Sequence, residues 1–259
     1  MLFARLRIVP PPILESPGSM CAATFGRMAR SVVLHGTVRC PRCQIAPRWC
    51  ICEGICNVDT SVAVDVLMHS GEIHRPTSTG NLIQRVMPEA RRHVFHHERL
   101  PSRESVARET TAGGQRVLWI LHPRGEPIAN ITPVPPTRDL QVLLIDGTWS
   151  QANTMLRHVE GWGQRVSLTM PAQQSRYWLR SQHRDGHFST IEALIFFLSA
   201  FGETNAAESL RLQFELHVYA SLLARGHKAD AAAFLADSPI TAALPDLVRK
   251  LAGYSPCAL

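Results

Sequence analysis

A continuous apolar run, residues 142–145, constrains the fold of this chain more than any other feature. Its Val-Leu-Leu-Ile sequence does not alternate with polar residues, which is the pattern of a strand covered on both faces in a parallel sheet. Further strands are predicted at residues 61–69, 91–97, 116–123 and 165–169, with helical patterns between them. The sequence therefore predicts an α/β fold with a mostly parallel sheet.

Four residues with polar or aromatic character, Asp146, Gly147, Thr148 and Trp149, follow this run directly. In open α/β sheets ligands bind at the carboxyl ends of the strands, where the helices that follow present free backbone N–H groups. We therefore expect Asp146 to face a ligand site. The alternative is that residues 146–150 form only a turn and a helix cap, because Asp, Gly, Thr and Ser all favour turns and caps.

The predicted helices begin at capping residues. Ser189 and Glu192 form a capping-box pair ahead of an apolar helix, and Asn205 with Glu208 indicates a second box that opens a helix over residues 208–225. Three further helices are predicted at residues 80–86, 102–111 and 150–162, and short helices follow residue 228. Because a helix N-terminus attracts anions, the helix after Ser189 is a candidate site for a carboxylate or phosphate.

Length and composition indicate a globular chain without a membrane segment. The chain has 259 residues, and no apolar run approaches the about 18 residues of a membrane span. We expect a soluble, cytoplasmic protein with no membrane association, and nothing in the sequence implies an obligatory protein partner. We divide the chain into a flexible tail (1–35), a cysteine-rich element (36–58) and a catalytic domain with a helical C-terminal part (59–259).

The basic side of the charge balance consists almost entirely of arginine. Lysine and arginine total 27 against 21 acidic residues, and Lys228 and Lys250 are the only lysines. Guanidinium groups make forked contacts to phosphate, so this bias is compatible with nucleic-acid binding. A general compositional preference for arginine is the alternative.

Five of the seven cysteines lie between residues 40 and 56. A CxxC pair followed by a CxC pair can offer four thiolates to a zinc ion, which predicts a structural zinc site. Free or redox-active cysteines are the alternative, and a disulfide framework is less favoured because nothing indicates an oxidising compartment. Cys56 is a spare or a substitute for one of the four. The predicted ligands are Cys40, Cys43, Cys50 and Cys52.

Two polar segments could line a site. Residues 70–79 follow the first strand as a loop rich in glycine, hydroxyls and charge, which suits a site wall. Residues 176–184 combine arginine, histidine and aromatic side chains, a composition that stacks bases and pairs phosphates. Candidates for RNA contacts are Arg75, Arg176 and Arg180, with Tyr177, Trp178, His183 and Arg184 in the same cluster.

Taken together, five motifs resemble the DTW-domain family of tRNA-uridine aminocarboxypropyltransferases. They are the cysteine knuckle, HSGEIHRPTSTG at residues 69–80, LHP at 121–123, DGTW at 146–149 followed by Gln-Ala, and STIEA at 189–193. The similarity extends over about residues 40–201. Two positions depart from the family's pattern: Ser78 stands where the family usually has Asn in T-N-T-G, and Trp178 where it more usually has Arg.

The resemblance implies a SPOUT-like, knotted α/β domain. The implied reaction moves the 3-amino-3-carboxypropyl group of S-adenosylmethionine to N3 of a uridine in tRNA and releases methylthioadenosine. Asp146 would accept the N3 proton or orient the uridine, with proximity supplying further acceleration. Trp149 would stack against the cationic donor. Other expected donor contacts are Leu121, His122, Pro123 and Thr148 around the adenosine, and Ser189, Thr190 and Glu192 at the helix that receives the donor's carboxylate.

Two other functions are compatible with the same residues. A SPOUT-like RNA methyltransferase would share the donor and the fold, and the mass of its product would distinguish it. A zinc-bearing RNA-binding module without catalysis would bind tRNA but show no affinity for S-adenosylmethionine.

Overall fold

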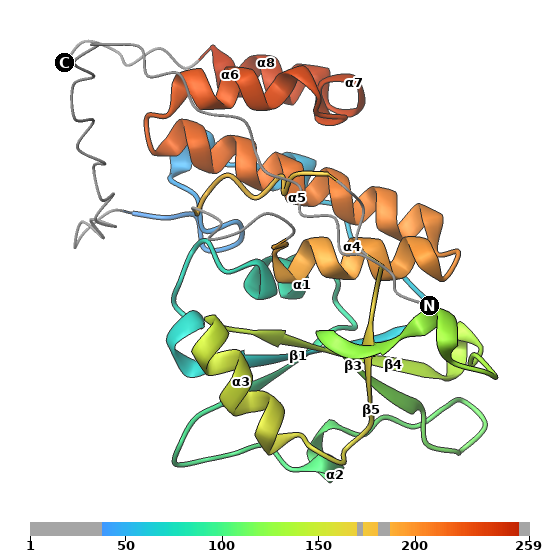
Figure 1. The fold of residues 1–259 in the computed structure, drawn as a ribbon. Helices are drawn as coiled ribbons and strands as arrows, with labels where there is room; N and C mark the ends of the chain where they lie inside the picture. Colours follow the sequence, from blue (N-terminus) through green and yellow to red (C-terminus); the bar gives the residue numbers. More distant parts are fainter. Residues whose placement is uncertain (1–37, 170–172, 181–186, 254–259) are drawn as a thin grey trace, which may run out of the picture. The chain divides into compact units, whose positions relative to one another are not determined.

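A five-stranded parallel sheet organises the computed structural model of this chain (Figure 1). Its order is β2-β1-β4-β3-β5, so the strand that ends in Asp146 lies in the middle. The structure describes residues 38–169, 173–180 and 187–253, and the predicted tail at residues 1–35 lies outside them. The strands are β1 (Ala63–His69), β2 (Arg91–Phe95), β3 (Val117–Pro127), β4 (Leu140–Asp146) and β5 (Gln164–Ser167).

Helices cover both faces of the sheet (Figure 1). On one face lies α3; on the other lie α1 and α4, with α5 packed beyond them and α6, α7 and α8 outermost. The bounds of the longer helices are α1 (Thr79–Val86), α3 (Trp149–His158), α4 (Thr190–Ala200), α5 (Thr204–Ala224) and α6 (Lys228–Ala236). The shorter ones are α2 (Arg103–Val106), α7 (Ile240–Ala243) and α8 (Pro245–Ala252).

Strand β1 shows why the sheet is covered on both sides. Val64, Val66 and Met68 belong to the large core with α1, α4 and α5, whereas Leu67 belongs to a smaller core beneath α3. Successive side chains of a strand point to opposite faces, so a strand buried on both faces needs apolar residues at almost every position. The predicted mostly parallel α/β sheet is confirmed, and the knotted, SPOUT-like topology stays a prediction.

One carboxylate interrupts this apolar strand. Asp65 is fully buried and accepts hydrogen bonds from Arg108 at 2.8 and 3.2 Å and from Gln141 at 2.9 Å; His93 Nε2 lies 2.8 Å from its Oδ1. Burial of an unpaired charge would be costly, so these partners are what permit Asp65 in the core. The network ties β1 to β2, to β4 and to the segment after α2.

The Arg108 contacts also explain a wrong prediction. The helix predicted at residues 102–111 ends at Val106, because Arg108 turns back to bind Asp65 and its backbone N–H donates to Gln141 Oε1. Gly113 does not cap a helix but occupies a turn with φ of 84° between the bridged residues Glu109 and Gln115. A tertiary ion pair therefore overrides the local helical pattern.

Two further boundaries differ from the predictions. The helix predicted to open at an Asn205–Glu208 box begins at Thr204, and its N-cap residue, Glu203, makes no side-chain capping bond. Strand β3, predicted over residues 116–123, continues to Pro127, with a register shift between Leu121 and Glu126. Within the described residues, no helix is both long and apolar enough to cross a membrane.

We predict that Arg108→Ala will destabilise the protein by about 3–5 kcal/mol, because it leaves the buried Asp65 carboxylate without its forked partner. The free energy of unfolding from urea denaturation measures this. Arg91→Ala is the control, since Arg91 lies opposite Asp65 in the strand register but is exposed. Equal stability of the two variants would contradict the assigned role of Arg108.

Candidate functional site

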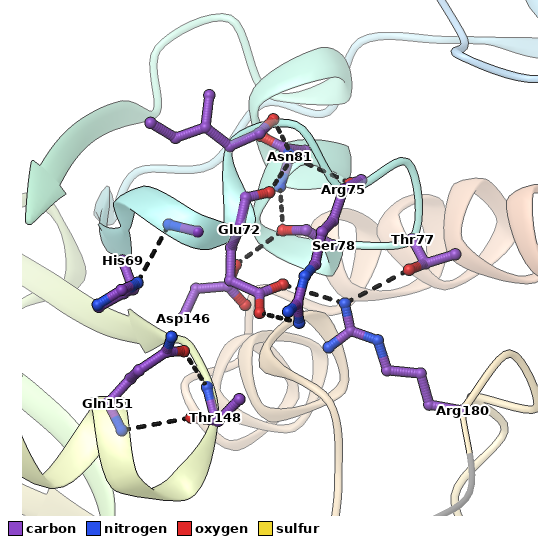
Figure 2. A network of polar contacts seen from close by, with 12 residues as sticks. His69, Glu72, Arg75, Thr77, Ser78, Asn81, Asp146, Thr148, Gln151 and Arg180 are labelled. Carbon is purple, nitrogen blue, oxygen red and sulfur yellow. Dashed lines mark hydrogen bonds and ion pairs between the residues drawn. The ribbon is translucent and has the colours of Figure 1, made fainter. Parts of the chain in front are cut away.

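Asp146 joins three elements at the carboxyl edge of the sheet. Its Oδ1 accepts a hydrogen bond from Thr190 Oγ1 at 2.7 Å, and its Oδ2 accepts one from Ser78 Oγ at 2.8 Å. Thr190 is the first residue of α4, and Ser78 is the N-cap of α1. The starts of two helices therefore converge on the end of β4, where ligands bind in open α/β sheets. Figure 2 shows Ser78 beside Asp146.

Helix α1 packs so closely on Asp146 that position 80 of the helix has space only for glycine. A Cβ on Gly80 would lie 2.7 Å from Asp146 Oδ2 and 2.9 Å from Met68 Cε. Ser78 also caps α1, because its Oγ accepts the Asn81 N–H at 3.3 Å. One hydroxyl thus fixes the helix start and one oxygen of the carboxylate.

Burial raises the pKa of Asp146 above its ordinary value, while the hydrogen bonds from Thr190 and Ser78 act in the opposite direction. The nearby Glu72 carboxylate raises this pKa further, and Arg180 lowers it. A raised pKa makes the ionised carboxylate a stronger proton acceptor. An ionised carboxylate has about four lone-pair positions, so two hydroxyl donors leave it able to accept from a ligand.

A second carboxylate, Glu72, lies beside Asp146 (Figure 2). It is buried, with 1% exposure, and accepts hydrogen bonds from Arg75 at 2.6 Å and Arg180 at 3.0 Å. Arg180 also lies 3.4 Å from Thr77 Oγ1. Asn81 holds the loop from within by donating to the carbonyl oxygens of Glu72, Ile73 and Arg75. The predicted polar loop is therefore an ordered wall of the site.

Thr148 and Trp149 open helix α3 in different ways. Thr148 forms a capping box with Gln151: its Oγ1 accepts the Gln151 N–H, and its own N–H donates to Gln151 Oε1 at 2.8 Å. Trp149 is 45% exposed, and its ring lies 4.7 Å from that of His187. The cap of α3 is thus Thr148 and not Asp146, and Trp149 presents an aromatic face to solvent.

His122 lies at the register shift of β3 with one ring nitrogen lacking a partner. Its Nδ1 accepts the Arg124 N–H at 3.1 Å, whereas its buried Nε2 has no hydrogen-bond partner among the described residues. Burial, with help from Arg124 and Arg165, lowers the pKa of His122 to about 4. The neutral ring therefore carries its proton on Nε2, which is available to donate to a ligand. Leu121 is half-buried in the strand, and Pro123 is exposed.

The start of α4 already holds a carboxylate. Glu192, which is 4% exposed, accepts from the N–H and hydroxyl of Ser189, both at 2.7 Å, and from the Arg176 N–H at 2.7 Å. The predicted capping box is confirmed. The electrostatic attraction of this helix start is therefore directed to an internal anion, which disfavours the expected role of Ser189 and Glu192 in holding the donor's carboxylate.

Arg176 is engaged inside the protein. Its Nη2 donates to Glu215 at 2.9 Å and to the Phe234 carbonyl at 2.7 Å, and its guanidinium lies 3.9 Å from the Phe234 ring centroid. Through these contacts Arg176 connects α5 to α6. Its side chain is 19% exposed and therefore offers little surface to RNA. Trp178 packs against Phe234. The predicted cluster members His183 and Arg184 lie outside the described residues.

The four predicted cysteine ligands converge on one point. The sulfur atoms of Cys40, Cys43, Cys50 and Cys52 lie within 4.8 Å of one another, with the closest pairs at 3.4 and 3.7 Å. A Zn–S distance of about 2.3 Å places tetrahedral sulfurs about 3.8 Å apart, so the geometry suits a thiolate-bound divalent ion. Cys56 is exposed and is not part of this cluster.

Comparisons with known proteins identify relatives of this chain. The profile of the DTW domain matches residues 37–222, which cover most of the chain. The chain belongs to the DTW domain family. It is also 26% identical over 193 residues to tRNA-uridine aminocarboxypropyltransferase 2 of Macaca fascicularis; the aligned part covers 67% of this chain and 60% of that protein. No solved structure matches significantly.

The two departures from the DTW family pattern have different structural settings. Ser78 replaces Asn, yet it performs the helix-capping task that both residue types favour, and it donates to Asp146. Trp178, in place of Arg, is 41% exposed and packs its ring edge-on against Phe234. Ser78 therefore supplies both a helix cap and a hydrogen bond to Asp146 at this position.

The sequence analysis did not predict the roles of several residues that shape this site. Gln151 completes the Thr148 cap, Asn81 orders the loop, and Tyr177 donates through its hydroxyl to the Thr77 carbonyl. The spacing of Thr148 and Gln151 is a capping-box pattern that could have been found. Asn81 and Tyr177 act through loop carbonyls, which leave no pattern in the sequence.

We predict that Cys43→Ser will lower the bound metal well below one ion per chain and destabilise the protein by more than about 3 kcal/mol, because metal loss is among the most damaging changes. Elemental analysis and urea denaturation measure the two effects. The control is Cys56→Ser, the same substitution at an exposed cysteine outside the cluster. If wild-type protein carries no metal and all its thiols react freely, the cluster is not a metal site.

Proposed function

We propose that this protein transfers the 3-amino-3-carboxypropyl group of S-adenosylmethionine to N3 of a uridine in tRNA. Its DTW domain and its similarity to a tRNA-uridine aminocarboxypropyltransferase support the reaction class. The observation that carries the proposal is the placement of Asp146, a buried carboxylate with a raised pKa at the carboxyl end of the central strand. Since the chain spans 60% of that relative's length, the activity is inferred from the shared part.

The proposed step forms one bond and breaks one. Uridine N3 attacks the Cγ atom of the aminocarboxypropyl arm, and the Cγ–S bond breaks with its electron pair passing to sulfur, which leaves as neutral methylthioadenosine. The N3 proton passes to Asp146. Thr190 and Ser78 hold the two oxygens of this carboxylate in place, so that an unused lone pair faces the incoming base.

Donor binding is assigned to residues of β3 and of the segment that follows β4. Trp149 presents an exposed aromatic face that can stack against the donor or the base, and a sulfonium is attracted to such a face. His122 offers an unpaired Nε2–H from a buried position on the next strand, β3. These contacts orient the donor, whose cationic sulfur already makes its thioether a good leaving group.

The cysteine cluster is assigned a structural zinc. It packs beside the start of the domain, with Cys43 inside the main hydrophobic core and Gln213 of α5 donating to the carbonyl of Gly54. A closed set of four thiolates leaves no open coordination position for catalysis. Arg39, Arg42 and Arg48 surround the cluster, and we assign them contacts with tRNA phosphates.

We predict that Asp146→Asn will reduce turnover by about two to four orders of magnitude, as expected for loss of a general base. Asn keeps the shape: its carbonyl oxygen accepts from one of the two hydroxyls, and its NH2 group donates to the other, whose hydroxyl hydrogen can rotate away. Folding and donor affinity should therefore be retained. Single-turnover transfer with saturating donor and tRNA, read by mass spectrometry of the nucleosides, measures the effect. A product heavier by one methyl group would instead indicate a methyltransferase.

The pH dependence gives an independent check. Because the pKa of Asp146 is raised, the wild-type rate should fall as the pH drops through that raised value, where the carboxylate becomes protonated. The residual rate of Asp146→Asn should lack this acidic limb. If Asp146→Asn keeps a rate within a few-fold of the wild type and the same pH profile, the role of Asp146 is only structural: it holds β4, α1 and α4 together.

A further inference from the structure

Two arginines meet on one buried carboxylate beside Asp146. Arg75 Nη1 lies 2.6 Å from Glu72 Oε1, and Arg180 Nη2 lies 3.0 Å from Glu72 Oε2. Each guanidinium therefore binds a different oxygen of the same group. The Glu72 side chain is 2% exposed, whereas the side chains of Arg75 and Arg180 are 47% and 39% exposed. Figure 2 shows both arginines reaching Glu72 next to the Asp146 side chain.

The charges of this cluster do not balance. One carboxylate faces two guanidinium groups, and arginine remains protonated in proteins, so these three side chains carry one positive charge. The Asp146 carboxylate lies beside them and loses its charge when it accepts the proton of uridine N3. In the described part of the chain, the hydrogen bonds of both guanidinium groups are confined to Glu72 and Thr77. Each guanidinium has five N–H donors in a forked arrangement, so both retain donors for an outside anion.

The other anion-attracting feature of the site is occupied. The start of α4 is filled by the Glu192 carboxylate, which accepts from Ser189, Ser175 and the Arg176 N–H. A second carboxylate there would meet like charge. The arginine pair is therefore the better recipient for an anionic group of a ligand bound at Asp146.

We propose that Arg75 and Arg180 together bind the α-carboxylate of the donor's aminocarboxypropyl arm, with Glu72 as the positioning residue that holds them. This proposal rests on the proposed function and names the subsite that would make it selective. Three carbon atoms beside sulfur can be attacked, and a carboxylate fixed at this pair anchors the arm whose Cγ must face N3.

A matched control cluster exists elsewhere in the chain. Glu215, also buried, is bound by Arg176 at 2.9 Å and by Arg211 at 3.3 Å. The Arg211 side chain is 53% exposed, close to the value for Arg75. Arg211→Ala therefore removes a comparable exposed arginine from a buried glutamate outside the site. Any effect shared by both substitutions reflects lost stability, not recognition of the donor.

The experiment compares two ligands by isothermal titration calorimetry without tRNA. S-adenosylmethionine carries the α-carboxylate, and decarboxylated S-adenosylmethionine is the same molecule without it. Arg75→Ala and Arg180→Ala should each weaken binding of S-adenosylmethionine about 10- to 100-fold, as for loss of a charge-assisted hydrogen bond, and leave the decarboxylated ligand almost unaffected. Arg75→Lys should recover part of the affinity, because it restores charge without the fork. Arg211→Ala should change neither affinity.

Several results would overturn the proposal. If Arg75→Ala and Arg180→Ala weaken both ligands equally, the carboxylate is bound elsewhere. If they leave S-adenosylmethionine binding intact but weaken tRNA binding and its salt dependence, the pair contacts phosphate, the RNA role expected for it from the sequence. If wild-type protein binds no S-adenosylmethionine, the proposed function fails as well. If the wild type forms the aminocarboxypropyl product, but the variants bind S-adenosylmethionine and its decarboxylated form with the same affinity ratio as the wild type, only the subsite is refuted.

Discussion

The buried carboxylate of Asp146 is the constraint on which the functional edge of this protein depends. A carboxylate in a site with 6% exposure needs hydrogen-bond donors, and here they come from the first residues of two helices, Thr190 of α4 and Ser78 before α1. Both helices must therefore begin at the end of β4. Gly80 allows α1 to approach so closely, because a Cβ there would overlap the carboxylate. The hydrogen bonds that stabilise the buried carboxylate also fix its orientation.

Local patterns were enough to predict the sheet and most helix starts. The strands could be predicted because burial on both faces requires continuous apolar runs. The Ser189–Glu192 capping box could be predicted because its two residues are three positions apart. Predictions failed where a residue distant in the sequence determines the local structure. The helix after Ser102 stops early because Arg108 binds Asp65, which lies 43 residues away in the sequence, and α5 begins without the predicted cap.

The same distinction applies to the site. Asp146, Trp149 and the cysteine ligands could be located because strand ends and cysteine spacing have direct structural consequences. The arrangement of Glu72 with Arg180 could not, since 108 residues separate them and neither lies in a local pattern that names the other. Residues chosen for charge alone were the least predictable: Arg176 carries the same side chain as Arg180 but is directed into the protein by Glu215 and Phe234.

Two clusters of one glutamate and two arginines show how the surroundings decide what such a cluster can do. At Glu215, the Arg176 guanidinium is enclosed by Phe234, and its Nη2 donates within the protein to Glu215 and to the Phe234 carbonyl, so the cluster connects α6 to α5. At Glu72, both arginine side chains are more exposed than that of Arg176 and lie beside Asp146, whose pKa responds to Glu72 and Arg180. An anion bound at that pair would offset the excess positive charge. It would also raise the pKa of Asp146, which couples occupancy of the subsite to the strength of the base.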